Sequence, residues 1–205
     1  MSITPAHYVQ PSPTDQPWQP RQVFLFSGHL IDAPDRSPPR FPKSKESIAA
    51  QQIAKTLDQF GADDQDLGLT QGANGGDILF AEACQQKGVK LQLLQPFEEA
   101  EFIKNSVIPG HANWLARYHA IIQKLDSHPL NAPETLGPLA DQMNAYERCN
   151  LWLLESAFFY SKDKVRLICL WDGSGKGRVG GTAHMVEEVR KRKGQVIWLD
   201  TRQLW

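Results

Sequence analysis

The sequence predicts an α/β fold with a mostly parallel sheet of about five strands and helices on both of its faces. Short apolar runs alternate with amphipathic stretches along the chain, which is the pattern of repeated strand–helix–strand units. Three of the predicted strands end directly in glycine-bearing turns. The 205 residues are enough for one domain with a full core and layers on both sides of a sheet.

The composition narrows the classes of function. The net charge of −1 and the isoelectric point near 6.6 provide no broad basic face, so we expect no nucleic-acid partner. The cysteines, Cys84, Cys149 and Cys169, lack metal-ligand spacing, which predicts buried free thiols, a cytoplasmic location and no metal site. Because no signal-like N-terminus and no apolar run of about 20 residues is found, we expect no membrane partner.

The first part of the chain predicts an arm followed by one strand–helix unit. Residues 1–20 contain five prolines and little apolar periodicity, so they predict an extended arm before a single domain over residues 21–205. Val23–Phe26 fits a buried parallel strand. The proline-rich loop Asp32–Lys43 then leads to a helix predicted over residues 44–60.

The middle of the chain repeats this unit. Leu67–Thr70 predicts a second strand, and the glycine-rich turn after it opens a helix predicted over Ile78–Gln86. Val89–Leu94 predicts a third strand. Two further helices are predicted after it, over residues 98–107 and 112–125.

The last part of the chain completes the sheet. The three prolines in residues 126–138 predict a loop, and a long amphipathic helix is predicted over residues 140–160. The apolar run Val165–Trp171 predicts the fourth strand, and a helix capped by Thr182 follows its glycine-rich turn. Gln195–Leu199 predicts the last strand.

The turn after the fourth predicted strand is the strongest candidate for a ligand site. Five of the nine residues in Gly173–Gly181 are glycine. Glycines let backbone amides approach a ligand closely, and the free N–H groups at a helix start favour an anion. We therefore predict a phosphate site over residues 173–182, with Lys176 and Arg178 as candidate phosphate clamps. The alternative is a glycine-rich connection that binds nothing.

The same turn also matches a dinucleotide-binding pattern. Residues 175–180 read G-x-G-x-x-G, and Asp200 follows twenty residues later. However, the first glycine of that pattern must lie in the tight turn that directly follows a strand, and here it is the fourth residue after the predicted strand. The match also lies in the last strand–helix–strand unit, so we base no function on it.

Two other glycine-bearing turns also follow strands directly, at residues 27–29 and 71–77. In an open parallel sheet, ligands bind beyond the carboxyl ends of the strands where the winding reverses. If the sheet reverses between the first and fourth strands, these turns and the phosphate site form one pocket. The candidate ligand-binding residues are Ser27, Gly28, His29, Gly72, Ala73, Asn74, Gly75, Gly76, Asp77, Asp172, Gly173, Gly180, Gly181 and Thr182.

Several polar residues at these turns have two interpretations. His29 is a candidate acid–base group or a polar contact to the ligand. Asp77 and Asp172 fit either ribose recognition or the capping of backbone N–H groups. On the long predicted helix, Arg148 or Asn150 reaches the pocket, or else they serve packing and the surface.

Three segments together resemble the SLOG superfamily, which includes the Lonely-Guy (LOG) and DprA-like Rossmannoid domains. They are Ser27–His29, the stretch QGANGGDILFA at residues 71–81, and Gly180–Thr182, and the resemblance covers about Val23 to Leu199. It implies a three-layer, Rossmann-like, doubly wound sheet in the order 3-2-1-4-5. It also implies that nucleotides or NAD-derived molecules bind at the point where the strand order reverses.

In the hydrolase members of this superfamily, a P-G-G-x-G-T-x-x-E motif seats the phosphate and supplies a catalytic glutamate. Here Gly181 and Thr182 occupy the glycine and threonine positions of that motif. The glutamate position falls on Met185, which cannot transfer protons. The remaining candidates for a catalytic carboxylate are Asp77, Asp172 and Glu187.

The resemblance therefore favours binding over catalysis. The first functional hypothesis is a domain that binds a nucleotide or nucleotide-derived ligand, as a sensor or as a module linked to a partner, with no obligatory cofactor. The alternative is a hydrolase that cleaves the N-glycosidic bond of a nucleotide or NAD-like molecule. Single-stranded DNA binding is the weakest hypothesis because the net charge is near zero. The sequence leaves open whether the chain forms a homo-oligomer.

Overall fold

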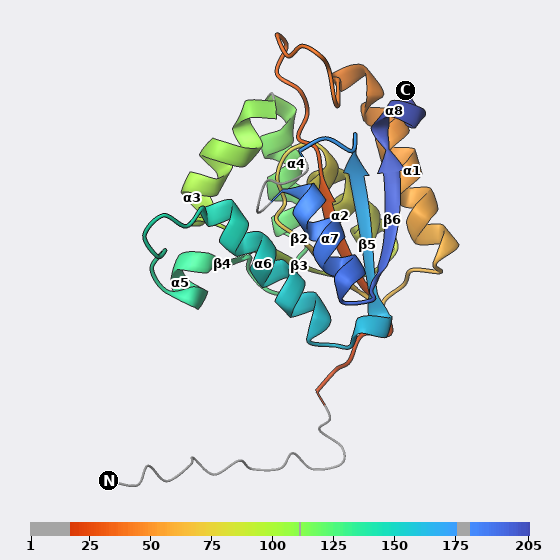
Figure 1. Cartoon of the computed structure of the whole chain (residues 1–205), viewed down its shortest axis with the longest axis vertical. Helices are drawn as coiled ribbons and strands as arrows, with labels where there is room; N and C mark the ends of the chain where they lie inside the picture. The colour runs from red at the N-terminus through yellow and green to blue at the C-terminus, as the bar shows by residue number, and fades with distance from the viewer. Residues whose placement is uncertain (1–16, 111, 176–180) are drawn as a thin grey trace, which may run out of the picture.

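The computed structural model describes residues 17–110, 112–175 and 181–205 (Figure 1). These residues form a six-stranded, all-parallel sheet flanked by helices on both faces, in the order β4-β3-β2-β1-β5-β6. This is a Rossmann-like, doubly wound α/β fold, which confirms the predicted fold class. The strands are β1 Val23–Gly28, β2 Leu67–Thr70, β3 Lys90–Gln95, β4 Leu130–Asn131, β5 Val165–Trp171 and β6 Gln195–Asp200.

The helices form the two outer layers. The larger ones are α1 Glu46–Gln59, α2 Gly76–Gln86, α4 Ala112–Ile122, α6 Ala145–Phe158 and α7 Thr182–Lys191. The shorter ones are η1 Lys43–Lys45, α3 Glu99–Phe102, the π-helical turn η2 Ile103–Val107, η3 Ile108–Gly110, α5 Ala132–Leu136, η4 Lys162–Lys164 and α8 Thr201–Leu204. None of these described helices has both the length and the apolar character needed to cross a bilayer.

The alternation of side chains along β1 creates a core on each face of the sheet. Phe24 and Phe26 point into a cluster with α1, α2 and α4, whereas Val23 and Leu25 point into a cluster with α6 and α7. A parallel strand that is buried on both faces must be apolar at successive positions. This requirement explains why the sequence shows β1 and β5 as continuous apolar runs.

The winding of the chain reverses beside β1. From β1 the chain proceeds outward through β2 and β3 to β4, and it then returns to place β5 and β6 on the other side of β1. β1 and β5 pair in register from Val23 opposite Val165 to Gly28 opposite Leu170. The five predicted strands therefore occur in the predicted order 3-2-1-4-5, and the crevice of this fold opens at the carboxyl ends of β1 and β5.

The sixth strand corrects the prediction of a loop over residues 126–138. β4 is only two residues long and pairs with Leu94 and Gln95 at the edge of the sheet. The Asn131 side chain then caps α5 by accepting a hydrogen bond from the N–H of Glu134. Two residues between prolines are too few to show a strand pattern in the sequence.

The prediction of a long helix over residues 140–160 was also wrong about where the helix begins. α6 begins at Ala145 because the Asn144 side chain accepts hydrogen bonds from the N–H groups of Tyr146 and Glu147. This capping arrangement fixes the position at which the helix begins.

All three cysteines are buried free thiols, as predicted.

Part of the predicted N-terminal arm packs on the sheet. The Nζ atom of Lys90 lies 4.1 Å from the ring centroid of Trp18, and the carbonyl of Pro20 accepts a hydrogen bond from Lys164. The rest of the arm, residues 1–16, lies outside the described residues.

Candidate ligand-binding site

A pocket of about 230 Å³ lies at the carboxyl end of β1, where the winding reverses. It combines segments that are far apart in the sequence, as expected for the crevice of this fold. Six predicted ligand-binding residues line it: Ser27, Gly28, Ala73, Asp77, Gly181 and Thr182. The other lining residues are Phe26, Leu30, Gln71, Asn105, Ser106, Tyr146 and Asn150.

A hydrogen bond between two hydroxyl groups joins the end of β1 to the beginning of α7 at the pocket. Ser27 Oγ lies 2.9 Å from Thr182 Oγ1, so the end of β1 meets the beginning of α7 across 155 residues of sequence. Thr182 is the first residue of α7 and Gly181 is its cap, which corrects the prediction that Thr182 itself caps the helix. The Thr182 hydroxyl instead faces the turn that leaves β1.

The beginning of α7 presents backbone N–H groups at the edge of this pocket. The first N–H group that bonds within the helix belongs to Met185, which donates to the carbonyl of Gly181 at 3.1 Å. Among the described residues, no acceptor pairs with the N–H groups of Gly181, Thr182 or Ala183. N–H groups that have no acceptor within the described chain and the positive end of the helix dipole together favour an anion at this position.

The glycine-rich turn before α2 is built differently, because its amides are already used. The N–H groups of Gly72 and Ala73 donate to Asp77 Oδ2 at 3.2 and 3.3 Å. The N–H of Asn74 donates to the carbonyl of Ser106, and that of Gly76 donates to the carbonyl of His29. This turn therefore shapes the pocket without offering these amides to an anion.

The glycines of that turn allow two backbone segments to pack closely. A side chain at Gly75 would place its Cβ 2.7 Å from the amide nitrogen of Ile31 and 2.8 Å from the carbonyl oxygen of His29. Gly75 also has a φ of 81°, a conformation that side chains disfavour. The segment after β1 can approach the beginning of α2 only because position 75 is glycine.

Asn74 connects this turn to two other segments. Its Oδ1 accepts a hydrogen bond from the N–H of Ile31, and its Nδ2 donates to the carbonyl of Ser106 at 2.8 Å. The Asn74 side chain is buried and its polar atoms face protein groups. The described lining of the pocket does not include Asn74 or the adjacent predicted residues Gly72, Gly75 and Gly76.

His29 links the ends of β1 and β5 beside the pocket. Its Nε2 accepts a hydrogen bond from the N–H of Asp172 at 3.1 Å, and the Asp172 carboxylate lies 3.2 Å from the same nitrogen. Burial, together with the positive charge of Arg40, lowers the pKa of His29 below its ordinary value of 6.5. A neutral His29 suits the role of acceptor. The described lining includes neither His29 nor the predicted residues Asp172 and Gly173.

Asp77 is the one carboxylate among the described residues that line the pocket. Burial raises its pKa to about 6, although the hydrogen bonds from Ala73 and Gly72 favour the charged form. Near neutral pH, a carboxyl group with this pKa can exchange a proton with a bound ligand. The geometry thus gives Asp77 two roles, one in shaping the turn and one facing the pocket.

The side of the pocket opposite α7 is lined by amide and hydroxyl groups. Tyr146 Oη lies 2.9 Å from Ser106 Oγ, and Gln71 Nε2 donates to Asn150 Oδ1 at 2.7 Å. Tyr146 and Asn150 are four residues apart on α6, so they share one face of the helix. This four-residue spacing is visible in the sequence and indicates that Tyr146 and Asn150 lie on the same side of the helix. Ser106 belongs to a π-helical turn for which the sequence gives no comparable signal.

Several other predicted residues have different environments. Arg148 turns away from the pocket and donates hydrogen bonds to the carbonyls of Gly137 and Pro138. Met185 is fully buried in the core beneath α7, and Glu187 is exposed on that helix.

Asp200, the acidic residue of the discounted dinucleotide pattern, instead caps α8 by accepting from the N–H of Arg202. Gly180, Lys176 and Arg178 lie outside the described residues.

Within the described part of the chain, no group of three or more histidine, cysteine, aspartate or glutamate residues has the arrangement of a metal site. Comparison of the sequence with protein-family models and with curated proteins finds no match.

Proposed function

We propose that this protein binds a nucleotide or a nucleotide-derived ligand, with its phosphate at the beginning of α7. The observation that carries this proposal is the contact between Ser27 and Thr182, because it brings a helix N-terminus to the pocket at the reversal of the sheet. Open parallel sheets bind their ligands at this position. The resemblance to the SLOG superfamily supports the same class of ligand.

The phosphate end of the pocket is defined by donors. The N–H groups of Gly181, Thr182 and Ala183 have no acceptor among the described residues, and two hydroxyl groups lie beside them. A phosphate oxygen accepts hydrogen bonds from amides and hydroxyls, and the helix dipole adds a favourable electrostatic contribution of about 0.3–1 kcal/mol. In the sequence, the positively charged Lys176 and Arg178 precede Gly181 by five and three residues.

The rest of the pocket suits a sugar and a base. Phe26 and Leu30 provide apolar surface, while Gln71, Asn105 and Asn150 provide amide groups. The volume of about 230 Å³ is below the range of roughly 300–1,000 Å³ of pockets that enclose drug-sized ligands. This size favours a mononucleotide, or one end of a larger ligand whose remainder lies in solvent.

A sensor, or a module that acts beside a partner, is the role that best fits this site. Met185 stands at the position of the superfamily's catalytic glutamate and is buried in the core. The chain therefore keeps the phosphate-binding residues of the motif, Gly181 and Thr182, but not its catalytic residue. We propose a cytoplasmic location on the basis of the three buried free thiols.

Asp77 favours a second candidate function, the hydrolysis of an N-glycosidic bond. It is a carboxyl group in the lining of the pocket with a pKa of about 6, which suits proton transfer near neutral pH. Its Oδ2 is occupied by two backbone amides, so catalysis depends on the other carboxylate oxygen. Release of a free base from AMP or of nicotinamide from NAD, followed by chromatography, distinguishes hydrolysis from binding alone.

Thermal unfolding of the full chain with AMP, NAD, ADP-ribose and cyclic nucleotides tests the binding proposal. A ligand present at one hundred times its Kd stabilises the folded state by about 2.7 kcal/mol, which is a readily measured shift. Thr182→Val removes the hydroxyl at the pocket, whereas Thr135→Val changes an exposed threonine on α5 and serves as the matched control. We expect the shift to decrease in the first variant and to persist in the control. Absence of a shift with every nucleotide would refute the proposal.

A further inference from the structure

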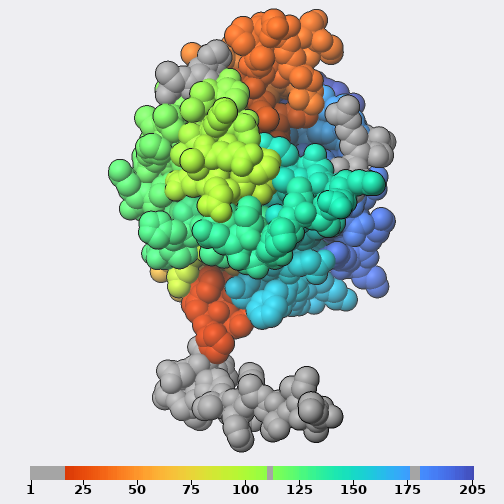
Figure 2. All heavy atoms as spheres, turned by 90° about the vertical axis from the view of Figure 1, so that its left-hand side faces the viewer, coloured from red at the N-terminus to blue at the C-terminus, as the bar shows by residue number. Residues whose placement is uncertain are grey.

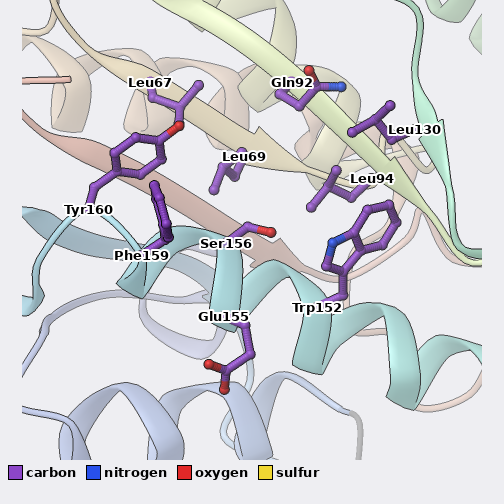
Figure 3. Close-up of a pocket in the computed structure, with 10 residues that line it drawn as sticks. All are labelled: Leu67, Leu69, Gln92, Leu94, Leu130, Trp152, Glu155, Ser156, Phe159 and Tyr160. Atoms are coloured by element: carbon purple, nitrogen blue, oxygen red, sulfur yellow. The ribbon is translucent and has the colours of Figure 1, made fainter. Parts of the chain in front are cut away.

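A second, larger hollow lies between α6 and the sheet, on the face that α6 and α7 cover. It is a groove of about 470 Å³ whose floor is formed by β2, β3 and β4 and whose wall is formed by the second half of α6 (Figure 3). Most of its lining is apolar: Leu67, Leu69, Leu94, Trp152, Phe159 and Tyr160. It shares no lining residue with the ligand pocket described above.

The groove leaves large apolar side chains unusually exposed. Phe159 is 79% exposed and Leu130 is 43% exposed, although both lie beside buried leucines of the sheet. The charged residue at the groove, Glu155, points away from the strands in Figure 3 and pairs with Arg192 at 2.7 Å. An apolar surface that is concave and lacks an inward charge is typical of a binding surface.

The N-terminal part of the chain reaches the sheet on this same face. Leu91 and Leu93 of β3 point into the opposite core, so the alternating residues Lys90, Gln92 and Leu94 point toward the groove. Trp18 packs over the Nζ atom of Lys90, with 4.1 Å between that atom and the ring centroid. The described chain therefore begins beside the groove.

The first described residues lie at one particular end of the groove. Lys90 pairs in register with Leu67, which lines the end of the groove nearest the beginnings of the strands, together with Tyr160. In Figure 2 the first described residues, drawn in red, lie against the cyan atoms that follow α6 in the sequence. The chain preceding Trp18 thus starts at one end of an open apolar groove.

We propose that this groove is the docking site of the chain's own N-terminal segment, residues 1–16. The segment carries Ile3, Tyr8 and Val9 and a single charged side chain, Asp15. Sixteen extended residues reach about 50 Å, several times the length of the three or four strand residues that form the floor. Because the segment is tethered beside the groove, docking is intramolecular and has a high effective concentration.

Photo-crosslinking in the full chain tests this proposal. A benzophenone amino acid replaces Tyr8, and the crosslinked residues are mapped by mass spectrometry after irradiation. We expect crosslinks within one chain to the groove, at Trp152, Phe159 or Leu94. Equal mixing of isotopically light and heavy chains separates crosslinks within one chain from those between two chains.

Two groove variants and one control make the test specific. Phe159→Lys changes a side chain that is largely exposed, so the fold persists, and Ser156→Arg places a charge inside the groove. Ile108→Lys changes another exposed apolar residue, outside the groove. The crosslinks should be lost in both groove variants and retained in the control.

The other outcomes overturn the proposal. Crosslinks to the groove of a different chain identify a second copy as the occupant. Crosslinks to other surfaces, no crosslink at all, or crosslinks that survive both groove variants show that this segment does not occupy the groove. None of these readouts depends on a nucleotide, so failure here leaves the proposed ligand site untouched.

Discussion

Ser27 Oγ and Thr182 Oγ1 lie 2.9 Å apart, and this contact joins the end of the first strand to the beginning of the helix that follows β5. The two residues are 155 positions apart in the sequence, yet both line the same pocket. The contact matters because it fixes the N-terminus of α7 relative to the reversal of the sheet.

The two hydroxyl groups should be energetically coupled. Ser27→Ala and Thr182→Val each remove one partner of the same hydrogen bond, so we expect each to lower the free energy of unfolding by about 1 kcal/mol. The double variant should lose less than the sum of the two single losses. Urea denaturation of the four proteins measures the difference, and strict additivity would show that the contact contributes nothing.

The residue that caps α7 should control the affinity for a nucleotide. In Gly181→Val, a branched side chain stands beside the N–H groups that face the pocket, while the extended backbone of residue 181 accepts any residue. We expect the nucleotide-dependent stabilisation to disappear and the unfolding transition without ligand to remain cooperative. Isothermal titration checks the affinity, and an unchanged Kd in the folded variant would contradict the phosphate assignment.

His29 should make the protein less stable in mild acid. Its pKa in the folded state is lowered by burial, so below pH 6.5 the unfolded chain takes up a proton before the folded chain does. Stability from this group is therefore complete above pH 6.5 and is lost as the pH falls. We expect His29→Gln to reduce this loss in urea denaturation between pH 7.5 and pH 5, with a slope of at most about 1.4 kcal/mol per pH unit. The control variant His119→Gln, at an exposed site, should lose stability with falling pH as the parent does.

The contribution of Asp77 to folding stability should depend on pH in the opposite direction. Its pKa is raised from 3.8 to about 6, so between these values the folded chain holds a proton that the unfolded chain has released. Its contribution to stability is complete below pH 3.8 and is lost as the pH rises through 6. Asp77→Asn should remove this decline, which is measured as the difference between the pH profiles of the variant and the parent. Identical profiles would mean that Asp77 titrates normally.

The sequence predicts the fold well wherever an element is buried on both sides. β1 and β5 are apolar at successive positions because they face two cores, and that pattern is visible without any structure. The edge strand β4 is missed because it has only two residues, an exposed leucine and a buried asparagine, and is held by pairing with Leu94 and Gln95. The beginning of α6 is missed because it depends on one capping side chain, Asn144.

The sequence likewise predicts part of the candidate site and misses part of it. Ser27, Gly181 and Thr182 are found from the sequence because turns after parallel strands converge at one edge. Whether an amide is available is a different question, since it depends on partners that are distant in sequence. The N–H groups of Gly72 and Ala73 look as accessible in the sequence as those of Gly181, but they are bound to Asp77.

The most direct test of the central claim is a crystal structure of the full chain soaked with AMP. We expect the phosphate to lie within about 3 Å of the backbone nitrogens of Gly181, Thr182 or Ala183, as charge-assisted hydrogen bonds require. A phosphate bound elsewhere, or a pocket that stays empty at saturating AMP while another surface binds it, would contradict the claim.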